Sequence, residues 1–240
     1  MGKRLRNSPL LESVCEFRFD PSSDWDMTIP GRVFERIKDK FPERSPFKTY
    51  GVKLNPQQIP IATIKEEEII RFKQPDGAAM VQVGRNLLAI NRLQYSKWED
   101  FRGLIIYVFE NYKQFVGDSK ISRIGLRYIN RIALKNPQID IGNIISLRPS
   151  LKGELDKPLK GFYQRYEIEE DDPEGVLIHQ TGLQRSGDEF AVMLDLDFGT
   201  TKTNESDDMH NIKLWLDSAH NRIYEAFIDS LNESYYEKIK

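Results

Sequence analysis

Cysteine is almost absent from this chain, since Cys15 is the only one among 240 residues. An internal disulfide is therefore excluded. Cys15 stands in an apolar, strand-like run, which predicts a buried thiol that packs as a small apolar side chain. An unpaired, reduced cysteine is typical of proteins of the cytosol. This scarcity therefore indicates a cytoplasmic protein without covalent cross-links.

Long apolar runs are missing as well. The longest, Leu104–Phe109, is far shorter than the roughly 20 residues that a membrane-spanning helix needs. The basic start of the chain, with Lys3, Arg4 and Arg6, is not followed by an apolar segment long enough for a secretory signal. These absences predict a soluble, cytoplasmic protein that does not associate with a membrane.

The chain also lacks an excess of one charge, because 35 Lys and Arg stand against 37 Asp and Glu, a net charge of −2. A basic surface for DNA or RNA is therefore not indicated by composition, and nucleic acid is an improbable partner. The charge is unevenly spread: residues 1–120 carry 20 basic and 16 acidic side chains, and residues 121–240 carry 15 and 21. The simplest interpretation is that the two oppositely charged halves attract each other.

Complete catalytic and cofactor motifs are also missing. The chain contains no G-x-S-x-G elbow, no phosphate-binding P-loop and no G-x-G-x-x-G fingerprint. Its paired carboxylates, such as Asp195 with Asp197, lack the partners that acid–base catalysis requires. The sequence therefore predicts no cofactor and favours a protein that is not an enzyme.

What is present is enough apolar material for a large core. Hydrophobic residues make up 39% of the chain and aromatic residues 11%. Helices are predicted from Ile29 to Phe41, from a capping box at Ser96 and Glu99 to Gly117, and from Met209 onward. A short helix or turn is predicted over Asp140–Leu147. Alternating or short apolar runs predict strands over Ser13–Asp20, Tyr50–Leu54, Ile61–Ile64, Ile69–Lys73, Gly77–Gly84, Leu87–Leu93, Ile121–Leu134, Phe162–Ile168, Val176–Leu183 and Glu189–Phe198.

The order strand, helix, several strands, helix thus occurs twice, over residues 1–117 and 118–240. Long helices set apart from antiparallel strands indicate the α+β class, with helices packed on one face of the sheet or sheets. The repeated β-α-β(3–4)-α order resembles the duplicated TBP-like saddle and, more loosely, a helix-grip sheet. No residue-level repeat accompanies it, so duplication is a topological hypothesis, and the halves are expected to form one compact unit.

Several stretches resemble one protein family. They are PLLESVCEFRF at 9–19, IPG at 29–31, VQVG at 81–84, LAINRLQYSKW at 88–98, RIGLRYINRI at 123–132 and DSAH at 217–220. Together they are similar to an uncharacterised bacterial family, sporadically distributed among genomes, whose members have about this length. The pieces PLxE…EFRF, RIGLRYxNR and DxAH are the most specific. The resemblance implies a bacterial protein and covers most of the chain, but it implies no activity or cofactor.

The stretch Ile121–Leu134 is the most unusual, because three arginines alternate with apolar residues. Such alternation places the arginines on one face of a strand and the apolar residues on the other. Gly125, between two of the arginines, either leaves that face open or marks a bulge. The side chains assigned to the face without helices are Glu16, Arg18, Arg123, Arg127, Arg131, Asp195 and Asp197, and less securely Gln82, Asn91 and His179.

Two interpretations of this face stay open. In the first, the acidic and basic side chains pair across strands and the face is only solvated. In the second, it is a binding surface, because the planar guanidinium of arginine binds carboxylate or phosphate through two parallel hydrogen bonds. Arg127 and Arg131 lie about 13 Å apart along a strand, too far for one small phosphate but suited to successive phosphates or a protein surface.

A second candidate site consists of Asp217 and His220, which share a face of the last helix at i, i+3 spacing. Carboxylate and histidine at this spacing bind metals in helical bundles. The chain has only three histidines, so the preferred interpretation is that Asp217 orients the imidazole and that no metal binds.

The sequence therefore favours a non-catalytic binding or regulatory module. Its mixed-charge sheet face would recognise an unknown protein partner or an anionic ligand, and oligomerisation is compatible with this function. A nucleic-acid-binding saddle and a metal-dependent hydrolase built on Asp217 and His220 are the alternatives.

Overall fold

The computed structural model describes residues 5–20, 25–53, 63–117, 119–134, 141–146, 160–187, 189–202 and 208–240, with only the backbone at 49–53 and 63–67. Its elements in chain order are β1 (Leu10–Phe19), α1 (Ile29–Ile37), β2 (Glu43–Lys53), β3 (Thr63–Lys73), β4 (Ala79–Gly84), β5 (Leu87–Arg92), α2 (Trp98–Lys113), β6 (Ile121–Leu134), the 3-10 turn η1 (Ile141–Asn143), β7 (Tyr163–Asp171), β8 (Glu174–Ser186), β9 (Glu189–Thr200), α3 (Met209–Ser230) and α4 (Glu233–Ile239).

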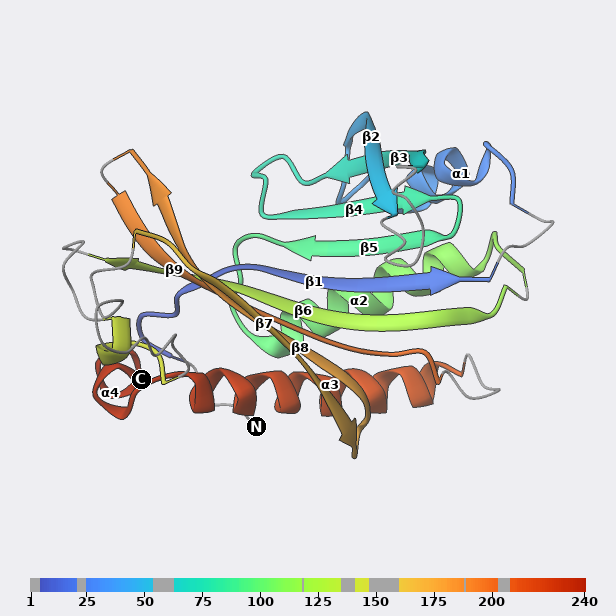
Figure 1. The fold of residues 1–240 in the computed structure, drawn as a ribbon. Coiled ribbons are helices and arrows are strands. Elements are labelled where there is room, and N and C mark those ends of the chain that lie inside the picture. Colours follow the sequence, from blue (N-terminus) through green and yellow to red (C-terminus); the bar gives the residue numbers. More distant parts are fainter. Residues whose placement is uncertain are drawn as a thin grey trace.

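The nine strands form one sheet in the order β2-β3-β4-β5-β1-β6-β9-β8-β7 (Figure 1). Every pairing in it is antiparallel. The α+β class with an antiparallel sheet is therefore confirmed. Residues 1–117 supply the strands on one side of the sheet and residues 118–240 those on the other. The two sides meet at the β1–β6 pair, where Cys15 lies opposite Leu126.

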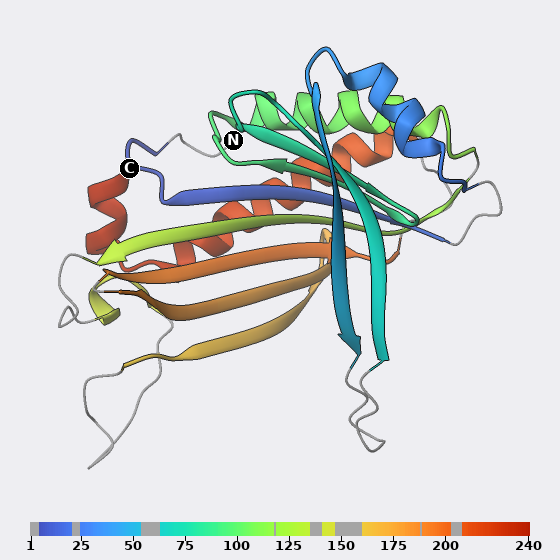
Figure 2. The same ribbon diagram turned by 90° about the horizontal axis from the view of Figure 1, so that it is seen from above.

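The helices α1, α2 and α3 lie on one side of this sheet (Figure 2). Packing of α2 on β1 brings the rings of Phe17 and Phe109 to 4.5 Å between centroids, and packing of α3 on β9 brings Phe198 and Trp215 to 5.9 Å. A single cluster of buried apolar side chains runs under the helices and contains residues of both halves. No described helix covers the opposite face, which we call the open face. None of the described helices has the length and apolarity that a membrane span requires.

Alternation along the strands decides which side chains reach the core. In β1, Cys15 and Phe17 are fully buried under the helices, whereas Glu16 and Arg18 lie on the open face. In β6, Leu126, Tyr128 and Ile132 are buried in the same way, and the arginines project to the other side. The period-2 pattern that predicted these faces is therefore confirmed in both central strands.

The structure differs from prediction at several element boundaries; for example, α1 ends at Ile37 and not at Phe41, and β2 begins at Glu43 and not at Tyr50. Helix α2 has Lys97 at its N-cap without a side-chain cap, and the Ser96 hydroxyl instead donates to the Asp100 carboxylate at 2.6 Å. The predicted capping box with Glu99 is therefore wrong, because the helix begins one residue later than the motif requires. The predicted strands over 61–64 and 69–73 belong to one longer strand from Thr63, and positions 61 and 62 lie outside the described residues.

Candidate functional site

The arginines of β6 lie on the open face, as predicted, and carboxylates from both neighbouring strands reach them. Arg123 donates to Glu16 of β1 at 3.2 Å and to Asp197 of β9 at 3.1 Å. Burial raises the pKa of Asp197, while the charge of Arg123 opposes that rise. Glu16 also accepts from Arg18 at 2.9 Å. The structure thus brings together four of the predicted site residues in one ion-paired group.

The other two arginines of β6 are paired separately. Arg127 makes a two-pronged contact with Asp195, with Nε to Oδ1 at 2.8 Å and the terminal nitrogen to Oδ2 at 2.5 Å. These hydrogen bonds raise the pKa of Arg127. Arg131 donates to Glu189 at 3.1 Å, and this carboxylate is largely exposed. The open face is therefore of mixed charge, and each arginine of β6 has an acidic partner.

Gly125 has a different role from either of those expected. It lies opposite Gly199 in the continuous β6–β9 register, so it does not mark a bulge. A Cβ at Gly125 would fall 2.5 Å from the guanidinium of Arg123, and one at Gly199 would fall 2.7 Å from it. The two glycines therefore leave a patch of bare backbone. The Arg123 guanidinium packs on this patch, between Glu16 and Asp197.

Hydrogen bonds between polar side chains continue across other strands of the open face. Arg71 donates to Gln82 at 3.1 Å, Gln82 to Asn91 at 2.9 Å, and Asn91 to Glu12 of β1 at 2.6 Å. Gln82 and Asn91 thus lie where the sequence placed them, and Glu12 is a member that sequence reasoning missed. This chain of polar contacts links β3, β4, β5 and β1.

His179 was also expected on the open face, and this expectation is wrong. Its side chain is 3% exposed on the helix side of β8, where Nε2 lies 2.8 Å from the Ser230 hydroxyl of α3. The reason is the register of β8, since His179 alternates in phase with the buried Leu177 and Thr181. Burial lowers the pKa of this histidine.

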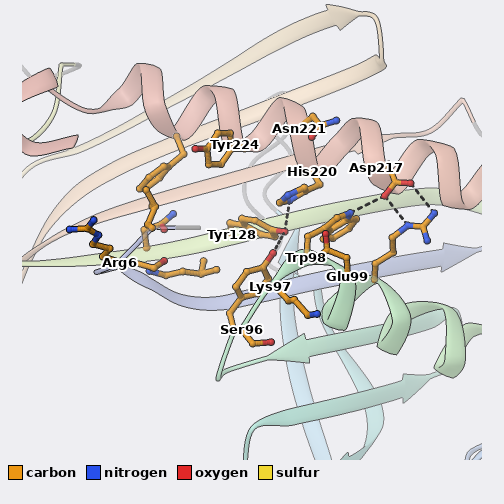
Figure 3. Close-up of a pocket in the computed structure, with 17 residues that line it drawn as sticks. Arg6, Ser96, Lys97, Trp98, Glu99, Tyr128, Asp217, His220, Asn221 and Tyr224 are labelled. Atoms are coloured by element: carbon orange, nitrogen blue, oxygen red, sulfur yellow. Dashed lines mark hydrogen bonds and ion pairs between the residues drawn. The ribbon is translucent and has the colours of Figure 1, made fainter. Parts of the chain in front are cut away.

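The second candidate site, at Asp217 and His220, borders a cavity of about 1000 Å³ (Figure 3). The cavity lies on the helix side of the sheet, between the N-terminal segment, the start of α2, β6 and α3. Its lining comprises Leu5, Arg6, Ser8, Leu10, Tyr95, Ser96, Lys97, Trp98, Glu99, Arg102, Tyr128, Asn130, Asp217, His220, Asn221, Tyr224 and Phe227. Aromatic side chains dominate the apolar part of this wall.

A chain of hydrogen bonds ends at His220. Its Nδ1 lies 2.8 Å from the hydroxyl of Tyr128, which lies 3.3 Å from the hydroxyl of Tyr95 (Figure 3). The indole of Trp98 stacks on the imidazole with ring centroids 4.3 Å apart and planes 5° from parallel. Burial lowers the pKa of His220 to about 4, and burial likewise raises the pKa of Tyr95 to about 12. The imidazole and both phenols are therefore uncharged at neutral pH.

Asp217 does not orient His220, contrary to the preferred interpretation of this pair. Its Oδ1 accepts from the Trp98 indole N–H at 2.8 Å, and its Oδ2 accepts from Arg102 at 2.8 Å (Figure 3). Asp217 thus positions the indole, and the indole in turn packs on the imidazole. The described residues contain no cluster of three or more His, Cys, Asp or Glu that could hold a metal ion. Arg102 also places a positive charge beside the carboxylate that a metal would need.

Exposure divides the cavity into a floor and a rim. Tyr128, Asn130 and His220 are buried at 8%, 4% and 9% exposure and form the floor. The rim carries exposed polar and charged residues, among them Lys97 and Asn221. Sequence reasoning had placed Tyr128 correctly on the apolar face of β6 but had assigned it no function. The sequence did contain a signal for this site. Tyr128 and Asn130 lie two residues apart on the core-facing side of a strand, and buried polar groups of this kind need hydrogen-bond partners.

Comparison of the chain with protein-family models and with curated proteins finds no match.

Proposed function

We propose that this protein is a non-catalytic binding module that takes a small organic ligand into the cavity between α2, α3, β6 and the N-terminal segment. The cavity itself carries this proposal. A concave site of about 1000 Å³ with mostly apolar and aromatic walls and a few convergent polar groups is typical of small-molecule binding. The ion-paired arginines of the open face are not among the residues that line this cavity.

The groups around the cavity favour binding over catalysis. A histidine with a pKa of about 4 is a weak general base at neutral pH. Both oxygens of Asp217 are already engaged by Trp98 and Arg102. The serine hydroxyls in the wall do not contact the imidazole, since Ser96 donates to Asp100 and Ser8 accepts from the backbone of Leu10.

The proposal is tested with the neutral fluorescent probe N-phenyl-1-naphthylamine. We expect a saturable rise in fluorescence with the wild-type chain, and binding about tenfold weaker or worse in Asn221→Trp, which places an indole at the exposed side of the cavity. Leu214→Trp is the matched control, because Leu214 is exposed on the same helix but outside the cavity. Equal binding by all three proteins, or none by the wild type, would contradict a ligand site here.

The open face is a second candidate, for a protein partner. Its specific support is that its charges of both signs stay partly exposed and that no described helix covers them. A lone anion would have to displace the bound carboxylates, so a partner surface bearing both signs fits better than nucleic acid. Arg131→Glu tests this, because its pair with Glu189 is solvent-exposed and its loss should leave the melting temperature nearly unchanged. A partner recovered by the wild type and equally by this variant would count against the open face.

We also propose that the two halves arose by duplication and form a TBP-like saddle. Each half places its first strand at the centre of the sheet, followed outward by its last strand and then the others in reverse order. A shared layout of this kind supports common descent of the halves. The second half departs from the first in having three strands after its central strand, where the first has four.

A further inference from the structure

The chemistry of the cavity floor restricts what part of a ligand it accepts. Its three buried polar residues are uncharged at neutral pH, and the nearby Asp217 and Arg102 neutralise each other. An ionised group inserted among them would lose its hydration without gaining an opposite charge, which is costly. The inserted part of the ligand is therefore uncharged, and any charged substituent stays at the rim.

The walls select a flat ring. Trp98 and His220 are already stacked in parallel, and Tyr224 and Phe227 of α3 line the same space (Figure 3). Aromatic side chains pack best on other aromatic rings, in offset-stacked or edge-to-face geometry. Because Asp217 holds the Trp98 indole in place, this wall is organised before a ligand enters.

The hydrogen-bond chain favours one tautomer of His220. If each hydroxyl donates inward, Tyr95 donates to Tyr128 and Tyr128 donates to Nδ1 of His220, so both hydroxyl protons have an acceptor within the chain. In the opposite direction the Tyr95 hydroxyl would need a further acceptor, and the described residues supply none. The inward direction places the proton of His220 on Nε2, which then faces the cavity as a donor.

Asn130 supplies the complementary group. Its amide nitrogen donates to the backbone oxygen of Leu194 at 3.2 Å, which fixes the orientation of the amide. The side-chain oxygen is then left as an acceptor in a residue that is 96% buried and lines the cavity. The floor therefore offers one donor, His220 Nε2–H, and one acceptor, Asn130 Oδ1, to a bound molecule.

We propose that the cavity binds an uncharged heteroaromatic ring whose edge carries a cyclic amide, with a C=O that accepts from His220 and an N–H that donates to Asn130. This ligand class rests on the proposed function, because it specifies what the same cavity recognises. The ring packs on the aromatic wall, and the amide edge meets the polar floor.

Three two-ring molecules of similar shape test the ligand class: 2-quinolone, which has the cyclic amide, naphthalene, which has no polar edge, and 2-naphthoate, which is an anion. Each is titrated against bound N-phenyl-1-naphthylamine, and 2-quinolone is also titrated directly by calorimetry. We expect 2-quinolone to bind about tenfold more tightly than naphthalene, as two net hydrogen bonds allow, and 2-naphthoate to bind most weakly.

His220→Phe separates the hydrogen bond from the packing, because a phenyl ring retains the stack on Trp98 and removes Nε2. We expect the ratio of 2-quinolone to naphthalene affinity to fall to about one, whereas Leu214→Trp keeps the wild-type ratio. Near-UV circular dichroism verifies that each variant is folded. Equal affinity of the wild type for 2-quinolone and naphthalene, or a preference for 2-naphthoate, overturns the ligand class alone. Absence of binding by every probe, including 2-quinolone in the calorimeter, overturns the proposed function as well.

Discussion

The two histidines that the structure buries, His179 and His220, are both in contact with hydroxyl groups. Neither has a described carboxylate within hydrogen-bond distance. Burial disfavours the imidazolium and, at His220, outweighs the opposing effect of the Asp217 and Glu99 charges, so the pKa of each histidine is lowered. A histidine of this kind stays uncharged at neutral pH. Protonating it costs more free energy in the folded chain than in the unfolded chain.

This difference between the folded and unfolded chain predicts that the stability of the protein depends on pH. The pKa of His220 is about 4 when folded and about 6.5 when unfolded. Between these values only the unfolded chain binds the proton, so the free energy of unfolding falls as pH drops from about 6.5 to 4, by on the order of 3 kcal/mol. His179 acts in the same direction. Urea unfolding of the wild type and His220→Phe at several pH values between 4 and 7 measures the effect.

The comparison must be made between the two proteins, because paired carboxylates also titrate at low pH in both. His220→Phe is expected to lose stability less steeply than the wild type over this range. Parallel curves would show that His220 is not held neutral by burial.

At the scale of single elements, β6 and β9 combine a pair of facing glycines with an arginine that lies over them. Arg123 is restrained by Glu16 and Asp197 and covers Gly125 and Gly199. The Arg123 side chain thus packs on the flat backbone surface that the two glycines leave. This packing explains why a strand rich in β-branched and charged residues contains glycine at this position. The cost of glycine in a strand is offset by the ion pairs that it permits.

The second prediction tests this arrangement with a double-mutant cycle. Gly125→Ala pushes its Cβ first into the Arg123 guanidinium, because the three nearest atoms all belong to that group. We expect it to lower the free energy of unfolding by about 1–2 kcal/mol in the wild type and by much less in an Arg123→Ala background, where the obstacle is gone. Equal costs in the two backgrounds would contradict the packing of Arg123 on Gly125.

Gly103→Ala serves as a matched control for the same substitution elsewhere. Gly103 lies in α2, and a Cβ there would meet nothing within 4 Å. Alanine is therefore expected to stabilise the chain slightly through its higher helix propensity. Chemical denaturation measures all of these variants in the same way.

At the scale of the whole molecule, the two halves are joined by both a strand pair and a shared site. β1 and β6 pair at the centre of the sheet, and the cavity takes Tyr95 and Trp98 from one half and Tyr128 and His220 from the other. The predicted boundary between residues 117 and 118 therefore separates segments that share one large apolar core.

The third prediction follows from this shared core. The fragments 1–117 and 118–240, expressed separately, are each expected to lack the dispersed amide spectrum of a folded domain, because each would expose one central strand as an edge and part of the common core. Mixing the two fragments should restore the dispersed spectrum. A well-dispersed NMR spectrum from either fragment alone would show that the halves fold independently.

The sequence by itself determined the faces of the strands and helices. Alternation in β1, β6 and β9 separates apolar from charged side chains with a period of two, and this local pattern is sufficient to predict that Arg123, Arg127 and Asp195 share one face. The same pattern predicted the α+β class, because helical and strand periodicities occupy separate stretches. The prediction for His179 was wrong because polar and apolar residues are mixed around it in β8. The sequence pattern therefore does not show which face of this strand meets the core.

Only the tertiary structure decided which charges pair and that a cavity exists. Tyr95, Tyr128 and His220 are separated by 33 and 92 residues, and no local spacing relates them. Asp217 and His220 share a helix face, yet Asp217 bonds to Trp98 and Arg102 from another helix, 119 and 115 residues away. The physical reason is that periodicity records only which side of an element meets the core. The choice of partner across that core depends on how α2 and α3 pack against the sheet, and this packing is a property of the whole chain.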